Sequence, residues 1–157
     1  MAVRWFVSGS DGLTIALVAL LIMTINRGNA FGQTGAAPSP VLETVIARDA
    51  DVGVDEPAPN SGGGDSTGYY FFGRRSKTPN FKGIFRKRIL HKGAAIGVQP
   101  QPQDEVYYVL SGTGDLTIDG VPQNVGARTA ILKRPGNSYG LRQVGNDDFV
   151  LIVSSGE

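Results

Sequence analysis

The chain of 157 residues contains no cysteine and a single histidine, His91. The absence of cysteine excludes disulfides, cysteine-ligated zinc, thiol redox chemistry and lipoprotein anchoring. One imidazole cannot form a metal site that needs several histidines. The sequence also lacks a P-loop, a nucleophile elbow, a glycine-rich dinucleotide motif and a His-Glu-x-x-His zinc motif. Because its net charge is only +1, we expect no nucleic-acid partner.

Turn-forming residues are abundant, with 22 glycines and 9 prolines. They favour many short strands over long helices, and no segment after residue 30 keeps a helical period. Asp119-Gly120 lies between two strand-like runs and predicts a tight hairpin. The run 149–153 is continuously apolar, as expected for a strand buried on both faces. We predict an all-β sandwich or small barrel with strands near 69–72, 81–90, 105–110, 115–123, 129–133 and 149–153.

Residues 1–30 are typical of a targeting segment. Arg4 gives a positive start, residues 13–25 are almost entirely apolar, and Gly28-Asn29-Ala30 places small residues at a cleavage position. The apolar run is shorter than the roughly 20 residues that a membrane-spanning helix needs. We therefore predict a signal peptide and a periplasmic or secreted protein without membrane contact after cleavage. An uncleaved anchor is the alternative.

The remaining chain divides at about residue 69. Residues 31–68 are expected to form a flexible leader and a loop, since 53–68 holds Pro57, Pro59 and the Gly62-Gly63-Gly64 run. A short strand or helical turn is expected near 41–46. Residues 69–157 are predicted to form the folded domain.

Charge is distributed unevenly. Residues 73–92 carry basic residues and no acidic residue, whereas the charged residues within 43–65 are all acidic except Arg48. These segments are interpreted either as two solvated surfaces that partly neutralise each other or as a basic rim that attracts anionic ligands.

Two motifs carry a family resemblance. Gly93 is followed after five residues by Gln99 and Gln101, then by Glu105 and, six residues later, by Gly112. This spacing resembles the first motif of the cupin superfamily, with glutamine at both histidine positions. The stretch 104–120 also resembles the hairpin that follows this motif.

The second cupin motif is matched less fully. Gly136 stands at its turn, Tyr139 replaces its histidine, and Gln143 falls at its asparagine position. Arg128 and Arg134 replace a glycine and a proline of the pattern. The resemblance implies a single-domain jelly-roll β-barrel over 69–157, and it implies a homodimer, since cupins commonly pair.

The resemblance also implies a site inside the barrel. Cupin metal ligands are three histidines and a carboxylate, and the matching positions here are Gln99, Gln101, Glu105 and Tyr139. Amide oxygen is a poor donor for transition metals. We therefore predict no cofactor and a polar ligand, such as a sugar, uronate or hydroxy acid, bound by Gln99, Gln101, Glu105, Tyr107, Tyr139 and Gln143.

Two other interpretations of these positions stay open. Glu105, Gln99, Gln101 and Tyr139 are all oxygen donors, so they suit a weakly held hard divalent cation. In the second interpretation, these four residues are polar residues of the core that form hydrogen bonds with one another. A metal-dependent dioxygenase is the least favoured function, because the histidines are missing.

Catalysis without a metal is a further hypothesis. A carboxylic acid enclosed by apolar side chains can exchange a proton near neutral pH, so Glu105 is a candidate base. Tyr107 or Tyr139 would then be the acid of an isomerase or lyase. His91 is expected in an exposed turn away from the site.

Arg86 and Arg88 share one face of the predicted strand 83–90. Turned inward, they would bind a ligand carboxylate bidentately. Because unpaired guanidinium groups are costly inside a small barrel, we expect both to point outward and Phe85 and Ile89 to point inward.

Overall fold

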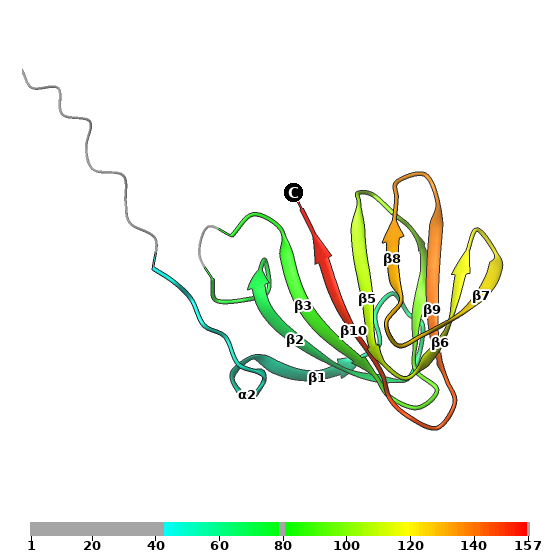
Figure 1. Cartoon of the computed structure of the whole chain (residues 1–157), viewed down its shortest axis with the longest axis horizontal. Helices are drawn as coiled ribbons and strands as arrows, with labels where there is room; N and C mark the ends of the chain where they lie inside the picture. The colour runs from blue at the N-terminus through cyan, green and yellow to red at the C-terminus, as the bar shows by residue number, and fades with distance from the viewer. Residues whose placement is uncertain (1–42, 79–80, 157) are drawn as a thin grey trace, which may run out of the picture. The chain divides into compact units, whose positions relative to one another are not determined.

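The computed structural model describes residues 43–78 and 81–156, and these form an all-β fold with one short helix, α2, at Asp49–Val52 (Figure 1). The predicted signal segment, residues 1–30, lies outside the described residues. Within the described ranges, no helix is long and apolar enough to cross a membrane.

The strands form two antiparallel sheets (Figure 1). The six-stranded sheet has the order β1 (Gly53–Pro57), β2 (Asp65–Gly73), β3 (Ile84–Leu90), β10 (Phe149–Ser155), β5 (Glu105–Ser111) and β8 (Ala130–Lys133). The four-stranded sheet has the order β4 (Ala95–Pro100), β9 (Ser138–Val144), β6 (Thr113–Ile118) and β7 (Val121–Gly126).

The hydrophobic core lies between the sheets, because both contribute to one cluster of buried side chains. Leu90, Val109 and Leu151 of the six-stranded sheet are fully buried, and Leu116 and Leu141 of the other sheet are almost so. Strand β10 lies between β3 and β5. Its apolar run predicted burial on both faces, but its side chains alternate between buried and partly buried, so only one face is fully buried. Burying one such leucine contributes roughly 2 kcal/mol.

The predicted hairpin is confirmed. Asp119 and Gly120 join β6 to β7, and both have a left-handed backbone with φ of 47° and 84°. Two consecutive residues with positive φ match the right-handed twist of the paired strands.

Three features differ from the sequence predictions. The sheets do not close into a barrel: in the part of the chain that the structure describes, no ladder of hydrogen bonds joins the two sheets. Strand β1 and the first residues of β2 lie within 31–68, where only a leader and loop were expected. Val45 and Ile46 belong to no strand or helix. Strand pairing with β2 stabilises β1, and single-strand periodicity could not reveal that partner.

Candidate functional site

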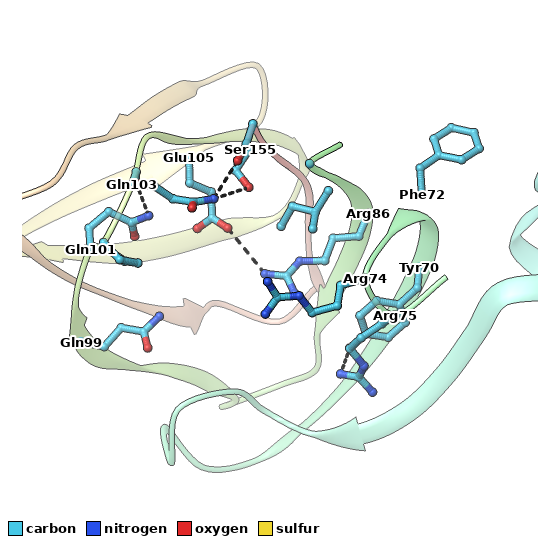
Figure 2. Close-up of a pocket in the computed structure, with 14 residues that line it drawn as sticks. Tyr70, Phe72, Arg74, Arg75, Arg86, Gln99, Gln101, Gln103, Glu105 and Ser155 are labelled. Atoms are coloured by element: carbon cyan, nitrogen blue, oxygen red, sulfur yellow. Dashed lines mark hydrogen bonds and ion pairs between the residues drawn. The ribbon is translucent and has the colours of Figure 1, made fainter. Parts of the chain in front are cut away.

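Two adjoining cavities open at one end of the domain. The first has a volume of about 370 Å³ and the second about 210 Å³. Both are lined by four of the same residues: Arg75, Arg86, Gln99 and Glu105. Figure 2 shows the first cavity with glutamines and Glu105 on one side and arginines on the other. The two cavities therefore share a polar, charged wall.

Strand alternation positions the charged side chains on the inner face. Arg86 and Tyr107 both pair with Val153 of the central strand β10, on opposite sides of it. Tyr70 of β2 pairs with Arg86 on its other side. Because residues two apart on a strand share a face, Arg88 points inward with Arg86.

The first group of charges, here called the Glu105 cluster, consists of Glu105, Lys133 and Arg86. Lys133 donates to Glu105 Oε2 at 2.8 Å and to the Tyr107 hydroxyl at 3.1 Å, and its side chain is only 2% exposed. Arg86 Nη2 lies 3.6 Å from Glu105 Oε1. The Nε of Arg86 is buried and has no hydrogen-bond partner among the described residues. One carboxylate therefore faces two cations.

The second group, here called the Glu56 cluster, consists of Glu56, Arg88 and Arg75. Arg88 donates to Glu56 Oε1 at 2.9 Å, and its buried guanidinium also donates to the Ser66 hydroxyl at 2.8 Å. Arg75 donates to Glu56 Oε2 at 2.9 Å. The Tyr70 hydroxyl donates to Glu56 and accepts from both arginines. Again one carboxylate faces two cations.

Ionisation in both clusters follows from these contacts. Burial alone would raise the pKa of Glu56, but hydrogen bonds from Tyr70, Arg75 and Arg88 hold it below its ordinary value. Burial, aided by the hydrogen bond to Glu56, raises the pKa of Tyr70. Burial and the neighbouring Glu105 charge raise the pKa of Tyr107 strongly, so Tyr107 stays protonated at neutral pH.

The expectation that Arg86 and Arg88 point outward is wrong. Arg88 is 2% exposed and Arg86 lines both cavities, whereas Phe85 lies at the surface. Burial of the two guanidinium groups is tolerated because Glu56 and Glu105 supply opposite charges.

Four of the predicted site residues come together at the cavities. Gln99 and Glu105 line both, Gln101 lines the first, and Tyr107 lines the second. Gln101 is buried and donates from Nε2 to the Gln103 carbonyl at 2.6 Å. Glu105 is not enclosed by apolar side chains as the catalytic hypothesis assumed, because Lys133 and Arg86 face it.

Tyr139 and Gln143 line neither cavity. Tyr139 belongs to the hydrophobic core, and its hydroxyl accepts from the Arg134 backbone N–H at 3.1 Å. Gln143 accepts from the Gly93 N–H at 2.6 Å and donates to three backbone carbonyls, of Val144, Gly145 and Asp147. The amide of Gln143 therefore joins two turns, and a ligand in the cavities would not reach it.

His91 lies outside both cavities, as expected, with a side chain that is 40% exposed. Its Nε2 lies 3.0 Å from the Thr67 hydroxyl, and its Nδ1 lies 3.2 Å from both carboxylate oxygens of Asp148.

Four site residues were not predicted from the sequence: Glu56, Tyr70, Arg75 and Lys133. Glu56 lies on β1, in a segment that was expected to be a loop. Lys133 pairs directly with Glu105 in the β5–β8 ladder, so a correct pairing of these two predicted strands would have found it. Tyr70 could have been found from the alternation of inward-facing and outward-facing side chains along β2.

The donor set does not suit the metal that the resemblance implies. Lys133 and Arg86 already face the Glu105 carboxylate, so a divalent cation there would meet two positive charges. The Tyr139 hydroxyl bonds to the backbone outside the cavities. Among the residues that the structure describes, no three histidine, cysteine, aspartate or glutamate side chains gather at one point.

Comparisons with known proteins agree with this fold. Residues 87–155 match the family model described as "Cupin domain". No curated protein matched the chain. Solved structures of similar fold are numerous.

Three of these structures indicate the extent of the likeness. A predicted oxalate decarboxylase from Thermotoga maritima has a TM-score of 0.62 at 18% identity, covering 70% of this chain and 96% of that one. A Cupin 2 conserved barrel domain protein from Salinispora arenicola has a TM-score of 0.56 at 14% identity, covering 75% and 91%. An RmlC-like cupin from Shewanella frigidimarina has a TM-score of 0.53 at 19% identity, covering 72% and 90%. At these identities the likeness concerns the fold.

Proposed function

Since the chain belongs to the cupin superfamily through the cupin domain at residues 87–155, we propose that it binds a small organic anion, such as a hydroxy acid or uronate, in the first cavity. The observation that carries the proposal is the position of the Arg86 guanidinium and its lack of close partners. Its guanidinium lines both cavities, its Nε is buried without a partner, and its one ion pair is long at 3.6 Å. A guanidinium that lines a cavity and has only a long ion pair keeps donors that a ligand carboxylate can accept from.

The rest of the lining suits a polar anion rather than an apolar one. Gln99 and Gln101 offer amide donors and acceptors for hydroxyl groups. Phe72 and Tyr70 give the opposite side apolar surface for a carbon skeleton. The first cavity falls within the range of roughly 300–1,000 Å³ that is typical of small-molecule sites.

Binding in this proposal needs no transition metal. Lys133 and Arg86 supply fixed positive charge beside Glu105, which is the electrostatic role that a bound cation would otherwise have. The protein is also proposed to be exported, on the basis of the signal-like residues 1–30.

A catalytic role for Glu105 with Tyr107 stays a prediction. Both carboxylate oxygens of Glu105 already face a cation, Lys133 at 2.8 Å and Arg86 at 3.6 Å, so neither oxygen is free to take a proton from a ligand. Binding therefore accounts for the geometry better than proton abstraction by Glu105.

The test is isothermal titration calorimetry of the purified protein with lactate, glucuronate and oxalate, and with glucose as the neutral match of glucuronate. Oxalate is included because the Thermotoga protein is described as a predicted oxalate decarboxylase. At least one anion should bind, and glucose should bind more weakly than glucuronate.

A pair of variants assigns any binding to the cavity. Arg86→Gln should weaken anion binding about tenfold or more, since it removes a charged donor. Arg142→Gln is the matched control, because Arg142 is an exposed arginine of β9 that lines neither cavity. Equal binding by both variants would remove the support for this site.

A further inference from the structure

The two charge clusters have the same composition. Each has one carboxylate between two cations, so each carries one excess positive charge. The Glu105 cluster is built on β3, β5 and β8. The Glu56 cluster is built on β1, β3 and the segment that follows β2.

Each cluster also divides its cations in the same way. Lys133 and Arg88 are buried, with side chains 2% exposed, and bond their carboxylates at 2.8 and 2.9 Å. The other cation of each cluster is accessible: the side chain of Arg86 is 25% exposed and that of Arg75 is 55% exposed. A buried cation neutralises each carboxylate, which leaves the accessible arginine as the excess charge.

Both accessible arginines line the same space. Arg75 and Arg86 each contribute to the first and the second cavity. The inward-facing arginines at the base of the two clusters, Arg86 and Arg88, are two residues apart on β3, which is about 7 Å along a strand. Each cluster therefore presents one excess positive charge to the two cavities, and the exposed Arg74 adds a further cation to the first cavity.

From this arrangement we infer that the ligand of the proposed anion site carries two negative groups, as a short dicarboxylate does, with one group held by Arg86 and the other by Arg75. The inference rests on the proposed function. A ligand with one charge would leave the excess positive charge of one cluster unbalanced, and a dianion balances the excess charge of both clusters.

The first measurement compares each dicarboxylate with its own monoamide by calorimetry at pH 8 and constant ionic strength. The pairs are oxalate with oxamate, malonate with malonamate, succinate with succinamate, and glutarate with glutaramate. Members of a pair have nearly the same size and differ by one charge. At the chain length that binds best, the dicarboxylate should bind about tenfold more tightly than its monoamide.

The variants test whether Arg75 and Arg86 each bind one carboxylate of the ligand. Arg75→Gln and Arg86→Gln should each bring the affinity ratio of dicarboxylate to monoamide close to one, since each removes the cluster charge that faces one carboxylate of the ligand. Arg142→Gln should keep the wild-type ratio. The melting temperature of each variant, measured without ligand, shows that it is folded.

The outcomes separate this inference from the proposed function. The dianion inference is overturned if the affinity ratio of dicarboxylate to monoamide is near one in the wild-type protein, or if this ratio is unchanged in the Arg75→Gln variant. Either result leaves the proposal of anion binding intact. Failure of every carboxylate in both titrations to bind overturns the proposed function and this inference with it.

Discussion

Glu105 and Lys133 face each other across the β5–β8 ladder, and their side chains meet at 2.8 Å inside the domain. The register of two antiparallel strands fixes this contact, so neither side chain has to bend out of its strand to reach the other. The same carboxylate also faces Arg86 from β3. The charge of Glu105 on β5 therefore links this strand both to its neighbour β8 and to β3, which is separated from β5 by β10.

Lys133→Met should destabilise the protein. It removes the close cation and leaves Glu105 with only the longer contact to Arg86, and breaking a buried ion pair from one side costs about 3 kcal/mol. The free energy of unfolding in urea measures the effect. Lys92→Met is the matched control, since Lys92 is exposed in a turn, and it should change stability by less than about 0.5 kcal/mol. Equal stability of the two variants would show that the pair contributes little.

Glu56 should make stability depend on acid pH. Its folded pKa lies below the ordinary value of 4.5, because Tyr70, Arg75 and Arg88 favour the charged form despite burial. A lowered pKa contributes stability that is fully present above about pH 4.5 and is lost as pH falls through the folded pKa. Urea unfolding of the wild type and of Glu56→Gln at pH 7 and pH 3 measures this.

The two proteins should differ most at pH 7, and the difference should shrink at pH 3, because below about pH 4.5 the unfolded chain takes up a proton on Glu56 more readily than the folded protein does. A difference that stays the same at both pH values would contradict this account of the Glu56 cluster.

Much of the fold could be predicted from the sequence, because its signals are local. Asp119-Gly120 predicts its hairpin by backbone conformation alone, and the apolar run of β10 predicts a strand, although only one face of that strand is fully buried. The separation into two open sheets could not be predicted in this way. Whether a β-sandwich closes depends on pairing at its edges, and β1 and β8 are edge strands whose outer sides no local pattern describes.

The site was predicted less completely, because strand pairing, which local sequence patterns do not show, brings part of it together. Gln99, Gln101, Glu105 and Tyr107 were found because a motif of fixed spacing carries them. Strand pairing brings Glu56 to the second cavity and Lys133 to Glu105, and no local motif carries either residue. Arg86 and Arg88 were placed on the correct common face but on the wrong side, since the cost of burying them was judged without Glu56 and Glu105 as their partners.

Leu151→Ala should be among the most destabilising changes in the core. Leu151 is fully buried between β3 and β5, and truncation of such a leucine costs about 2–5 kcal/mol through lost burial and a residual cavity. Leu110→Ala removes the same atoms from a side chain that is 45% exposed, so its cost should be below about 1 kcal/mol. Denaturant unfolding of both variants gives the comparison, and similar losses would mean that Leu110 is covered in solution.

Gln143→Ala and Gln99→Ala should have opposite effects, although the sequence analysis assigned both residues to the ligand. Gln143 satisfies the Gly93 N–H and three carbonyls, so its loss should lower the free energy of unfolding by about 1–3 kcal/mol. Anion affinity should stay within about twofold of wild type, because Gln143 lines neither cavity.

Gln99→Ala should weaken anion binding several-fold and change stability by less than about 1 kcal/mol, since Gln99 lines both cavities and is only partly buried. Calorimetry and urea unfolding on the two variants separate the roles. If Gln143→Ala instead weakened binding as much as Gln99→Ala while leaving stability intact, the ligand would have to lie deeper between the sheets than the two cavities allow.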